Sequence, residues 1–337
     1  MSDLRVAVVG AGLMGADHIA RITQRIAGAV VSAVVEPDKA RGEAALKNAP
    51  GAKAYADIVP ALADNAMDAV LVATPGQFHE PVLMPALEEG IPVLCEKPLT
   101  PDSESAMRIV QAEIAAGKQL IQVGFMRRFD AEYMQLQELI SSGVHGELLA
   151  LRCQHRNPSV PDSYHNEMLI FDSVVHEIDV VRFLTGSPIV AVEVKPLKRN
   201  SNNLEHLNEP VLVFLETESG VVADVEMNVS VRFGYQVKTE AVFENGIAEI
   251  GRTSGMTVWS EGRYGGAEHT SFKTRFGAAY DNQIQQWVDA TQAGTIDGPS
   301  AWDGYLAAAT VEAGLEALKT GERAEVNYQP MPKFYQK

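Results

Sequence analysis

The feature that most constrains the fold of this chain is the glycine-rich run Gly10-Ala11-Gly12-Leu13-Met14-Gly15. It follows a valine-rich run (4–9) typical of a buried parallel strand, and it precedes a helical stretch (16–26). The first glycine permits a tight turn, the second lets the backbone approach a pyrophosphate, and the third lets helix and strand pack closely. Free N–H groups at the start of such a helix bind phosphate. We therefore expect a dinucleotide-binding turn formed by Gly10, Gly12, Leu13, Met14 and Gly15.

A carboxylate at the end of the next strand supports this interpretation. The β-branched run 30–35 ends at Glu36, 21 residues after Gly15. An acidic residue at this place binds the hydroxyls of the adenosine ribose and repels a 2′-phosphate, which favours NAD over NADP. Lys39 and Arg41 lie near enough to leave NADP open, and a helix-capping role for Glu36 before Pro37 is the alternative.

The strand–helix alternation continues to residue 124 and predicts an α/β fold, a doubly wound parallel Rossmann sheet over 1–124. Strands are expected at 69–73, 91–95 and 120–123, with helices at 80–89 and 102–116. Ligands bind at the carboxyl ends of such strands. Thr74-Pro75 and Glu96-Lys97 fall at these ends, so we expect them beside the cofactor.

Lys97 is a candidate for chemistry. It follows an apolar strand and precedes Pro98, which restricts its backbone. Most lysines are solvated surface groups. A lysine at the carboxyl edge of a dinucleotide-binding sheet can instead stabilise a developing alkoxide.

A second candidate is the pair Asp172 and His176. Apolar residues recur at helical spacing over 171–184, and Thr185-Gly186 is a typical helix stop. Residues four apart share one helix face, and a carboxylate beside an imidazole can orient a general base. The alternatives are that Asp172 is only an N-cap and that His176 is only a hydrogen-bonded interior histidine.

The remaining residues, 125–337, predict a second domain of the α+β class with an open, mostly antiparallel sheet. Strand-like runs occupy 146–155, 189–197, 210–216, 221–230, 235–244, 246–250 and 256–259, and helices are expected at 131–141, 280–293 and 301–319. Asn245-Gly246 is a hairpin signal. In the run 221–231, alternation places Val221, Ala223, Val225, Met227 and Val229 on one face.

Composition narrows the class of protein. The 337 residues are 46% apolar, enough for two well-formed cores, and the formal net charge of −16 argues against nucleic acid and anionic membranes as partners. Cys95 and Cys153 predict no disulfide framework, which suits the cytoplasm. We expect no signal peptide, and the sequence has no apolar run long enough for a bilayer. A second histidine of a zinc-binding helix is missing, because Val180 follows His176 four residues on, so no metal is expected.

Several blocks of the chain together resemble one known family. They are Gly10–Gly15 with Glu36, Thr74-Pro75 with His79, Glu96-Lys97-Pro98, and Asp172 with His176. They resemble the Gfo/Idh/MocA family of NAD(P)-dependent sugar and polyol oxidoreductases over essentially the full chain. Within it, the blocks 124–130, 155–158 and 172–179 look most like those of the bacterial inositol 2-dehydrogenases.

The resemblance implies roles for individual residues. Lys97, Asp172 and His176 match the catalytic lysine, aspartate and histidine of the family, and Pro98 matches a proline often preceded by a cis peptide bond. His79 would join the cofactor-binding residues Glu36, Thr74, Pro75, Glu96 and Lys97. Substrate-binding positions would be Lys97, Arg127, His155, Asn157, Asp172 and His176, with Tyr235 and Tyr280 matched through shorter motifs. A homo-oligomer, and a tetramer in particular, is also implied by the resemblance.

The function implied is NAD-dependent oxidation of a cyclic polyol in the cleft between the domains, most simply myo-inositol to 2-keto-myo-inositol (scyllo-inosose), with His176 as general base. Another inositol isomer or a pyranose such as glucose is the first alternative. An NAD-dependent glycosidase and a non-catalytic NAD sensor are the other two. A sensor would have no need to keep Lys97, Asp172 and His176 together.

Overall fold

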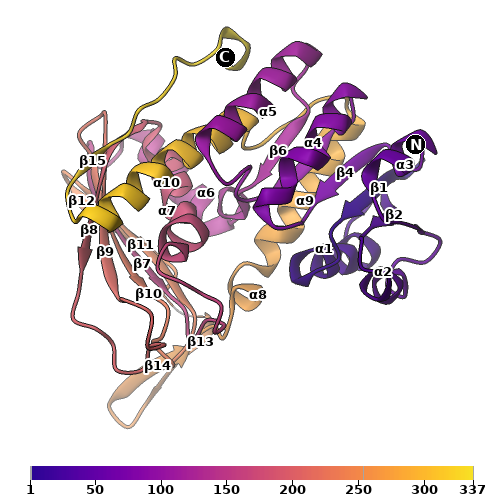
Figure 1. Cartoon of the computed structure of the whole chain (residues 1–337). Helices are drawn as coiled ribbons and strands as arrows, with labels where there is room; N and C mark the ends of the chain where they lie inside the picture. The colour runs from indigo at the N-terminus through magenta and orange to yellow at the C-terminus, as the bar shows by residue number, and fades with distance from the viewer. Residues whose placement is uncertain (1, 253, 337) are drawn as a thin grey trace. The chain divides into compact units, whose positions relative to one another are not determined.

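The computed structural model describes residues 2–252 and 254–336, and the chain forms two compact units (Figure 1). The first unit comprises residues 2–125, 280–308 and 329–336. The second comprises Met126–Ala279 and Ala309–Tyr328.

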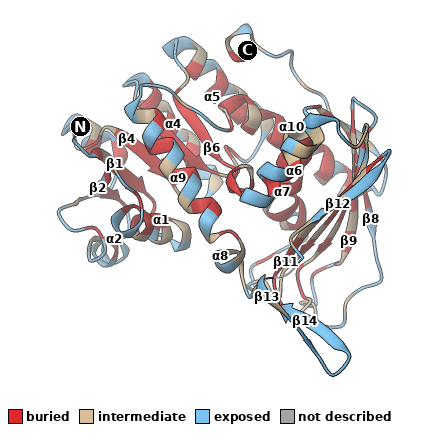
Figure 2. Ribbon diagram, turned by 180° about the vertical axis from the view of Figure 1, so that it is seen from behind, coloured by how far each residue is buried: buried red, intermediate tan, exposed pale blue. Residues whose placement is uncertain are grey.

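The first unit is built on a parallel six-stranded sheet, which confirms the expected Rossmann fold. Its strands, in spatial order, are β3 (Lys53–Tyr55), β2 (Ala29–Val35), β1 (Leu4–Val9), β4 (Ala69–Val72), β5 (Val93–Glu96) and β6 (Ile121–Gly124). Strands β4, β5 and β6 are buried along their whole length, which explains why they read as unbroken apolar runs (Figure 2). Because all six strands are parallel, their carboxyl ends meet at one edge of the sheet.

Helices follow the strands of this sheet in alternation. They are α1 (Leu13–Gln24), α2 (Lys39–Leu46), α3 (Ile58–Ala63), α4 (His79–Glu88) with the 3₁₀ turn Gly76–Phe78, and α5 (Ser103–Ala116). Asp38, Asp57 and Asp102 cap the helices α2, α3 and α5 by accepting backbone N–H groups. Of these elements, β3 and the helices α2 and α3 are too short and too weakly patterned for sequence periodicity to identify them.

The first unit also takes in residues from the end of the chain, whereas the sequence predicted that everything after 124 belongs to the second domain. Helix α9 (Gly277–Gln292) places Ile284, Trp287 and Val288 in the same buried cluster as Val8 of β1 and Ile19 of α1. Near the C-terminus, the hydroxyl of Tyr335, in the 3₁₀ turn Lys333–Tyr335, donates to the buried carboxylate of Glu113. Burial of these aromatic residues accounts for the return of the chain.

The second unit contains a seven-stranded sheet that is mostly antiparallel, as expected. In spatial order its strands are β12 (Gly246–Ile250), β11 (Gln236–Phe243), β7 (Leu148–Arg156), β10 (Val222–Asn228), β9 (Val211–Thr217), β8 (Ile189–Pro196) and β15 (Ala324–Glu325). Strands β7 and β10 are the parallel pair within it. The predicted alternation in β10 is confirmed, because Ala223, Val225 and Met227 are fully buried while Asp224 and Glu226 are partly exposed. The hairpin at Asn245 is also present.

The helices of the second unit are α6 (Ala131–Ser142), α7 (Val175–Thr185), α8 (Phe272–Arg275) and the last part of α10 (Ala301–Thr320), with a 3₁₀ turn at Met126–Phe129. The sequence predicts one helix from 171 to 184, but the structure has a π-helix at Leu169–Val174 before α7. Gly186 ends α7 in the left-handed conformation, as the pattern indicated. Single π-helical turns often mark functional sites.

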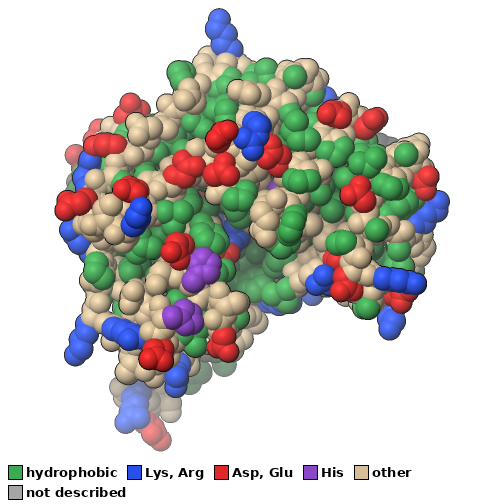
Figure 3. All heavy atoms as spheres, viewed as in Figure 1, with side chains coloured by type: hydrophobic (Ala, Val, Ile, Leu, Met, Phe, Trp, Pro, Cys, Tyr) green, Lys and Arg blue, Asp and Glu red, His purple; other side chains and the backbone are tan. Residues whose placement is uncertain are grey.

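The hairpin of β13 (Ser254–Ser260) and β14 (Arg263–Ala267) pairs only with itself in the described part of the chain and exposes Trp259 and Tyr264. On the face drawn in Figure 3, acidic and basic side chains are interspersed. Among the described residues, no helix is long and apolar enough to cross a membrane.

Candidate active site

The glycine-rich turn of the first unit has the geometry that a dinucleotide requires. A Cβ on Gly15 would lie 1.9 Å from the carbonyl oxygen of Gly10, and a Cβ on Gly10 would lie 2.9 Å from the backbone of Ala73. Gly12, by contrast, has nothing within 4 Å of its Cβ position. It is the N-cap residue of α1, and as a glycine it offers no side chain to the first N–H groups of the helix. The turn is therefore tightly packed at Gly10 and Gly15 and open at Gly12, and Leu13 is exposed at the start of the helix. Open space at Gly12 and free N–H groups of the first helical turn suit a pyrophosphate.

Glu36 lies directly beside this turn. One carboxylate oxygen, Oε2, accepts the N–H of Ala11 at 2.9 Å, and the other, Oε1, accepts the N–H of Asp38 at 3.0 Å. The guanidinium of Arg41 is 3.2 Å from Oε1. Glu36 thus lies against the glycine-rich turn and pairs with Arg41.

We expect replacement of Glu36 by alanine to shift the cofactor preference towards NADP⁺. The carboxylate that repels a 2′-phosphate is lost, and Arg41 is released to meet that phosphate. The ratio of kcat/KM for NAD⁺ to that for NADP⁺ should fall about tenfold or more, equivalent to about 1.4 kcal/mol. Glu43→Ala is the matched control, because it removes an equal charge from an exposed position of α2. An unchanged ratio in Glu36→Ala would contradict the assignment.

Two backbone turns at the carboxyl edge of the sheet are tied together by His79. Its Nε2 is 2.8 Å from the carbonyl oxygen of Thr74, and its Nδ1 is 2.9 Å from that of Pro98. The ring is fully buried, and burial lowers the pKa of His79 despite these backbone contacts. His79 therefore supports the cofactor edge through the two turns. The expected cis bond between Lys97 and Pro98 is present, and Lys97 is half-buried at the end of β5.

The Thr74 hydroxyl oxygen is buried at this edge and has no hydrogen-bond partner in the part of the chain that the structure describes. Pro75 follows it on the exposed side. A buried polar group without a partner is costly, so the Thr74 hydroxyl is suited to a ligand.

In the second unit, three predicted substrate residues come together. The rings of His155 and His176 have centroids 6.3 Å apart, and the ring of Tyr235 is 6.2 Å from that of His155. They come from β7, from α7 and from the segment before β11. Asn157, just beyond β7, has a buried side-chain oxygen without a hydrogen-bond partner among the described residues. Asp172 lies within the π-helix and not at its N-cap, so the interpretation as an N-cap is wrong.

Behind these side chains lies a buried ion cluster formed by Arg127, Glu177 and His155. Arg127 donates to Oε1 of Glu177, and Nδ1 of His155 is 3.1 Å from Oε2. Arg127 and Glu177 are each 1% exposed. Burial alone would raise the pKa of Glu177, but Arg127 and His155 hold it at about 2. The cluster fixes the ring of His155 on the sheet.

Helix α7, which carries Glu177, makes a second ion pair with the 3₁₀ turn. Arg128 donates to both carboxylate oxygens of Asp179, at 2.6 to 3.1 Å. The two adjacent arginines of the 3₁₀ turn thus clamp the two acidic residues of α7. This explains why the block 124–130 accompanies the block 172–179 in the sequence.

Two buried polar residues, one in each unit, escaped the sequence interpretation. Glu177 is one, and the other is His18, which is fully buried on the apolar stripe of α1 beside Ile19 and Ile22. A polar residue within an apolar stripe was the available signal in both cases. Tyr280, predicted to bind substrate, lies in the first unit with its ring 6.0 Å from that of His18.

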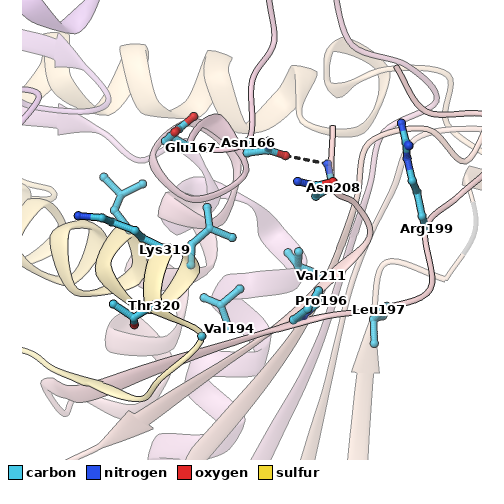
Figure 4. A pocket seen from close by; sticks show the side chains of 13 residues that line it. Asn166, Glu167, Val194, Pro196, Leu197, Arg199, Asn208, Val211, Lys319 and Thr320 are labelled. Carbon is cyan, nitrogen blue, oxygen red and sulfur yellow. Dashed lines mark hydrogen bonds between the residues drawn. The ribbon is translucent and has the colours of Figure 1, made fainter. Parts of the chain in front are cut away.

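A cavity of about 740 Å³ in the second unit shares no residue with this constellation (Figure 4). It lies between β8, the end of α10 and the segment before the π-helix. Asn166 there accepts the backbone N–H of Asn208 at 2.7 Å, and Arg199 donates to the carbonyl of Leu204. These polar groups are engaged by the protein itself. Among the described residues, no cluster of three or more His, Cys, Asp or Glu side chains is placed to hold a metal ion.

A parallel Rossmann sheet with an open glycine-rich turn beside a carboxylate is typical of NAD-binding proteins. Residues 4–125 match the family model described as "Oxidoreductase family, NAD-binding Rossmann fold", and residues 133–249 match the "GFO/IDH/MocA C-terminal domain". The chain belongs to the Gfo/Idh/MocA family.

Individual relatives are similar over nearly the whole chain. An inositol 2-dehydrogenase of Corynebacterium glutamicum is 60% identical and covers 99% of both chains. One of Leifsonia xyli is 58% identical over 99% of this chain and 98% of its own. The crystal structure of myo-inositol dehydrogenase from Lactobacillus casei, in complex with NAD(H) and myo-inositol, is 36% identical with a TM-score of 0.96, covering 99% of this chain and all of that one.

Proposed function

We propose that this protein is an NAD-dependent dehydrogenase that oxidises myo-inositol to 2-keto-myo-inositol. The substrate assignment rests on one observation, which is the 60% identity, over 99% of both chains, with a protein named inositol 2-dehydrogenase. The arrangement of hydrogen-bonding side chains in the second unit agrees with a polyhydroxylated ligand, because His155, Asn157, His176 and Tyr235 offer several donors and acceptors.

In the proposed mechanism, His176 accepts the proton of the reacting hydroxyl as general base. Asp172, four residues earlier in the chain, orients the imidazole and stabilises its charged form. Lys97 stabilises the alkoxide that develops as the proton leaves. NAD⁺, when bound, supplies the acceptor for the carbinol hydrogen as hydride.

The other ring hydroxyls are proposed to be recognised by His155, Asn157, Tyr235 and Arg127, with Tyr280 as a further proposed contact. Arg127 is 1% exposed and bound to Glu177, so its contribution is proposed to pass largely through the ring of His155. A site built to hydrogen-bond hydroxyls rejects analogues that lack them, because its polar groups are then left unpaired.

The experiment that tests the proposal measures reduced-nicotinamide absorbance with purified protein and myo-inositol, using NAD⁺ and then NADP⁺. Scyllo-inositol, D-chiro-inositol and glucose form the comparison panel. We expect the highest kcat/KM with myo-inositol and NAD⁺. Turnover confined to another isomer or to glucose would change the proposed substrate but leave the proposed mechanism intact. No turnover across the panel, with NADH still bound, would favour a glycosidase or a sensor and contradict the proposal.

We also propose that the protein is a cytoplasmic homotetramer that acts in polyol catabolism. The exposed hairpin β13–β14 supports self-association, since Trp259 and Tyr264 are 74% and 77% exposed and stack on each other. A native mass of about four times the 36.5 kDa of the chain is expected in sedimentation velocity. A single species at the mass of one chain would contradict it.

A further inference from the structure

A buried pair in the first unit has no role in the mechanism proposed so far. Nε2 of His18 lies 2.7 Å from Oε1 of Glu96, the last residue of β5. His18 is fully buried, and the side chain of Glu96 is 9% exposed. Withdrawing such groups from water has a free-energy cost that an apolar pair would avoid, so the pair calls for an explanation beyond stability.

Glu96 links His18 to the proposed catalytic lysine, because its carboxylate accepts a hydrogen bond from each of these residues. A carboxylate only accepts, so Nε2 of His18 carries the proton and donates it to Glu96. The other oxygen of Glu96, Oε2, accepts the backbone N–H of Lys97 at 3.3 Å. Both oxygens of Glu96 are thereby engaged, one by helix α1 and one by the peptide from which the lysine side chain projects.

The pair of His18 and Glu96 is closely surrounded by other residues of the first unit. A Cβ on Gly124 of β6 would approach Oε2 of Glu96 to 3.0 Å, so the glycine provides the space for the carboxylate. On its other side, the ring of His18 meets the edge of Tyr280, over which the guanidinium of Arg21 lies at 5.2 Å. Nδ1 of His18 has no hydrogen-bond partner in the described part of the chain, so Glu96 is the polar contact that the imidazole makes there.

The lysine turn is thus held from both sides by buried imidazoles. Before Lys97, His18 acts through Glu96; after it, His79 is hydrogen-bonded to the carbonyls of Pro98 and Leu99 at 2.9 and 3.2 Å. A displacement of about 1 Å in a catalytic group can lower a rate about 100-fold. The turn that contains Lys97 is therefore fixed on both sides, as accurate placement of the lysine ammonium group requires.

We propose that His18 is a positioning residue for the oxidation: by holding Glu96, it fixes the backbone of Lys97 and so the place of its ammonium group. This inference rests on the proposed role of Lys97. It predicts a defect in the chemical step, with cofactor binding retained.

The test compares His18→Leu with His18→Gln in the myo-inositol assay. Leucine removes the donor to Glu96, whereas the glutamine amide can donate from near the place of Nε2. We expect kcat per NADH-binding site to fall about 10- to 100-fold in His18→Leu and to recover largely in His18→Gln, with NADH affinity changed less than about threefold. The primary deuterium isotope effect on kcat, with inositol deuterated at the reacting carbon, should rise in His18→Leu because the chemical step becomes slower.

Glu113→Gln is the matched control. Glu113 is another buried carboxylate of the same unit, on helix α5, where it accepts the N–H groups of Leu120 and Ile121. Its replacement should lower the melting temperature while kcat per site and the isotope effect stay at wild-type values. A merely structural role for His18 would give the same result in His18→Leu and would overturn the inference.

Two further outcomes are decisive. If glutamine at position 18 is as poor as leucine, donation to Glu96 is not what matters, and the inference fails. If His18→Leu does not fold, Glu96→Gln takes its place, and it must lower kcat and raise the isotope effect for the inference to stand. Wild-type protein that oxidises no member of the panel would instead contradict the proposed function itself, whatever the variants do.

Discussion

Replacement of Lys97 by methionine lowers kcat for myo-inositol oxidation by about 10²- to 10³-fold, the range found when one group that stabilises a developing oxyanion is removed. Methionine keeps an unbranched apolar stem in this half-buried position but has no positive charge. NADH affinity should change little, because the glycine turn and Glu36 are untouched. Steady-state kinetics and NADH fluorescence titration measure the two quantities separately, and Lys97→Ala should behave alike.

Lys118→Met is the control for this variant, since it removes a lysine from an exposed position of the same unit. Its kcat should equal that of the wild type. Normal turnover in Lys97→Met would show that the lysine is not catalytic. A loss of NADH affinity as large as the loss of kcat would assign Lys97 to cofactor binding alone.

Replacement of Glu177 by glutamine destabilises the second unit by about 3–5 kcal/mol, because it leaves the guanidinium of Arg127 buried without its counter-ion. Thermal unfolding should shift down by about 10 °C for a unit of this size. Glu240→Gln is the control: its partner Arg152 is exposed, and such surface pairs contribute about 0–1 kcal/mol. The double variant Arg127→Met with Glu177→Gln should recover part of the loss, since no unpaired charge then remains buried.

The same pair predicts a dependence on pH. The pKa of Glu177 is lowered from 4.5 to about 2 in the folded protein, so between these values the unfolded chain binds the proton more tightly. The stabilisation by this carboxylate is therefore complete above about pH 4.5 and disappears as the pH falls towards 2. The difference in unfolding free energy between wild type and Glu177→Gln should shrink over that window. A difference that is constant from pH 6 to 3 would mean that Arg127 does not stabilise the carboxylate.

Much of the fold was predictable because its signals are local. The β1 run, the glycine turn and the start of α1 form one continuous stretch, in which Gly10 has a positive φ and a Cβ on Gly15 would meet the carbonyl oxygen of Gly10. Period-two alternation in β10 and the left-handed Gly186 after α7 are likewise set by neighbours in sequence. The short elements β3, α2 and α3 carry too few residues for a period to show.

The candidate site was predictable in part, through motifs whose residues stand close together. Glu96-Lys97-Pro98 and the spacing of Asp172 and His176 are visible in the sequence, although the π-helical turn that contains Asp172 is not. The partners behind them were not predictable. Glu177 reads as one more residue of an apolar helix until Arg127, 50 residues earlier in the chain, is seen beside it.

The sequence by itself determined the glycine-rich turn, the carboxylate after the second strand, the lysine before a proline and the class of each sheet, since glycine sterics, charge and side-chain periodicity act over a few residues. Only the tertiary structure decided that α9 returns to the first core, that His18 supports Glu96 across 78 positions, and that Arg127 holds α7. The physical reason is the same in each case. The order of strands in a sheet and the burial of charge in pairs depend on which distant segments share a core, and no local pattern records that choice.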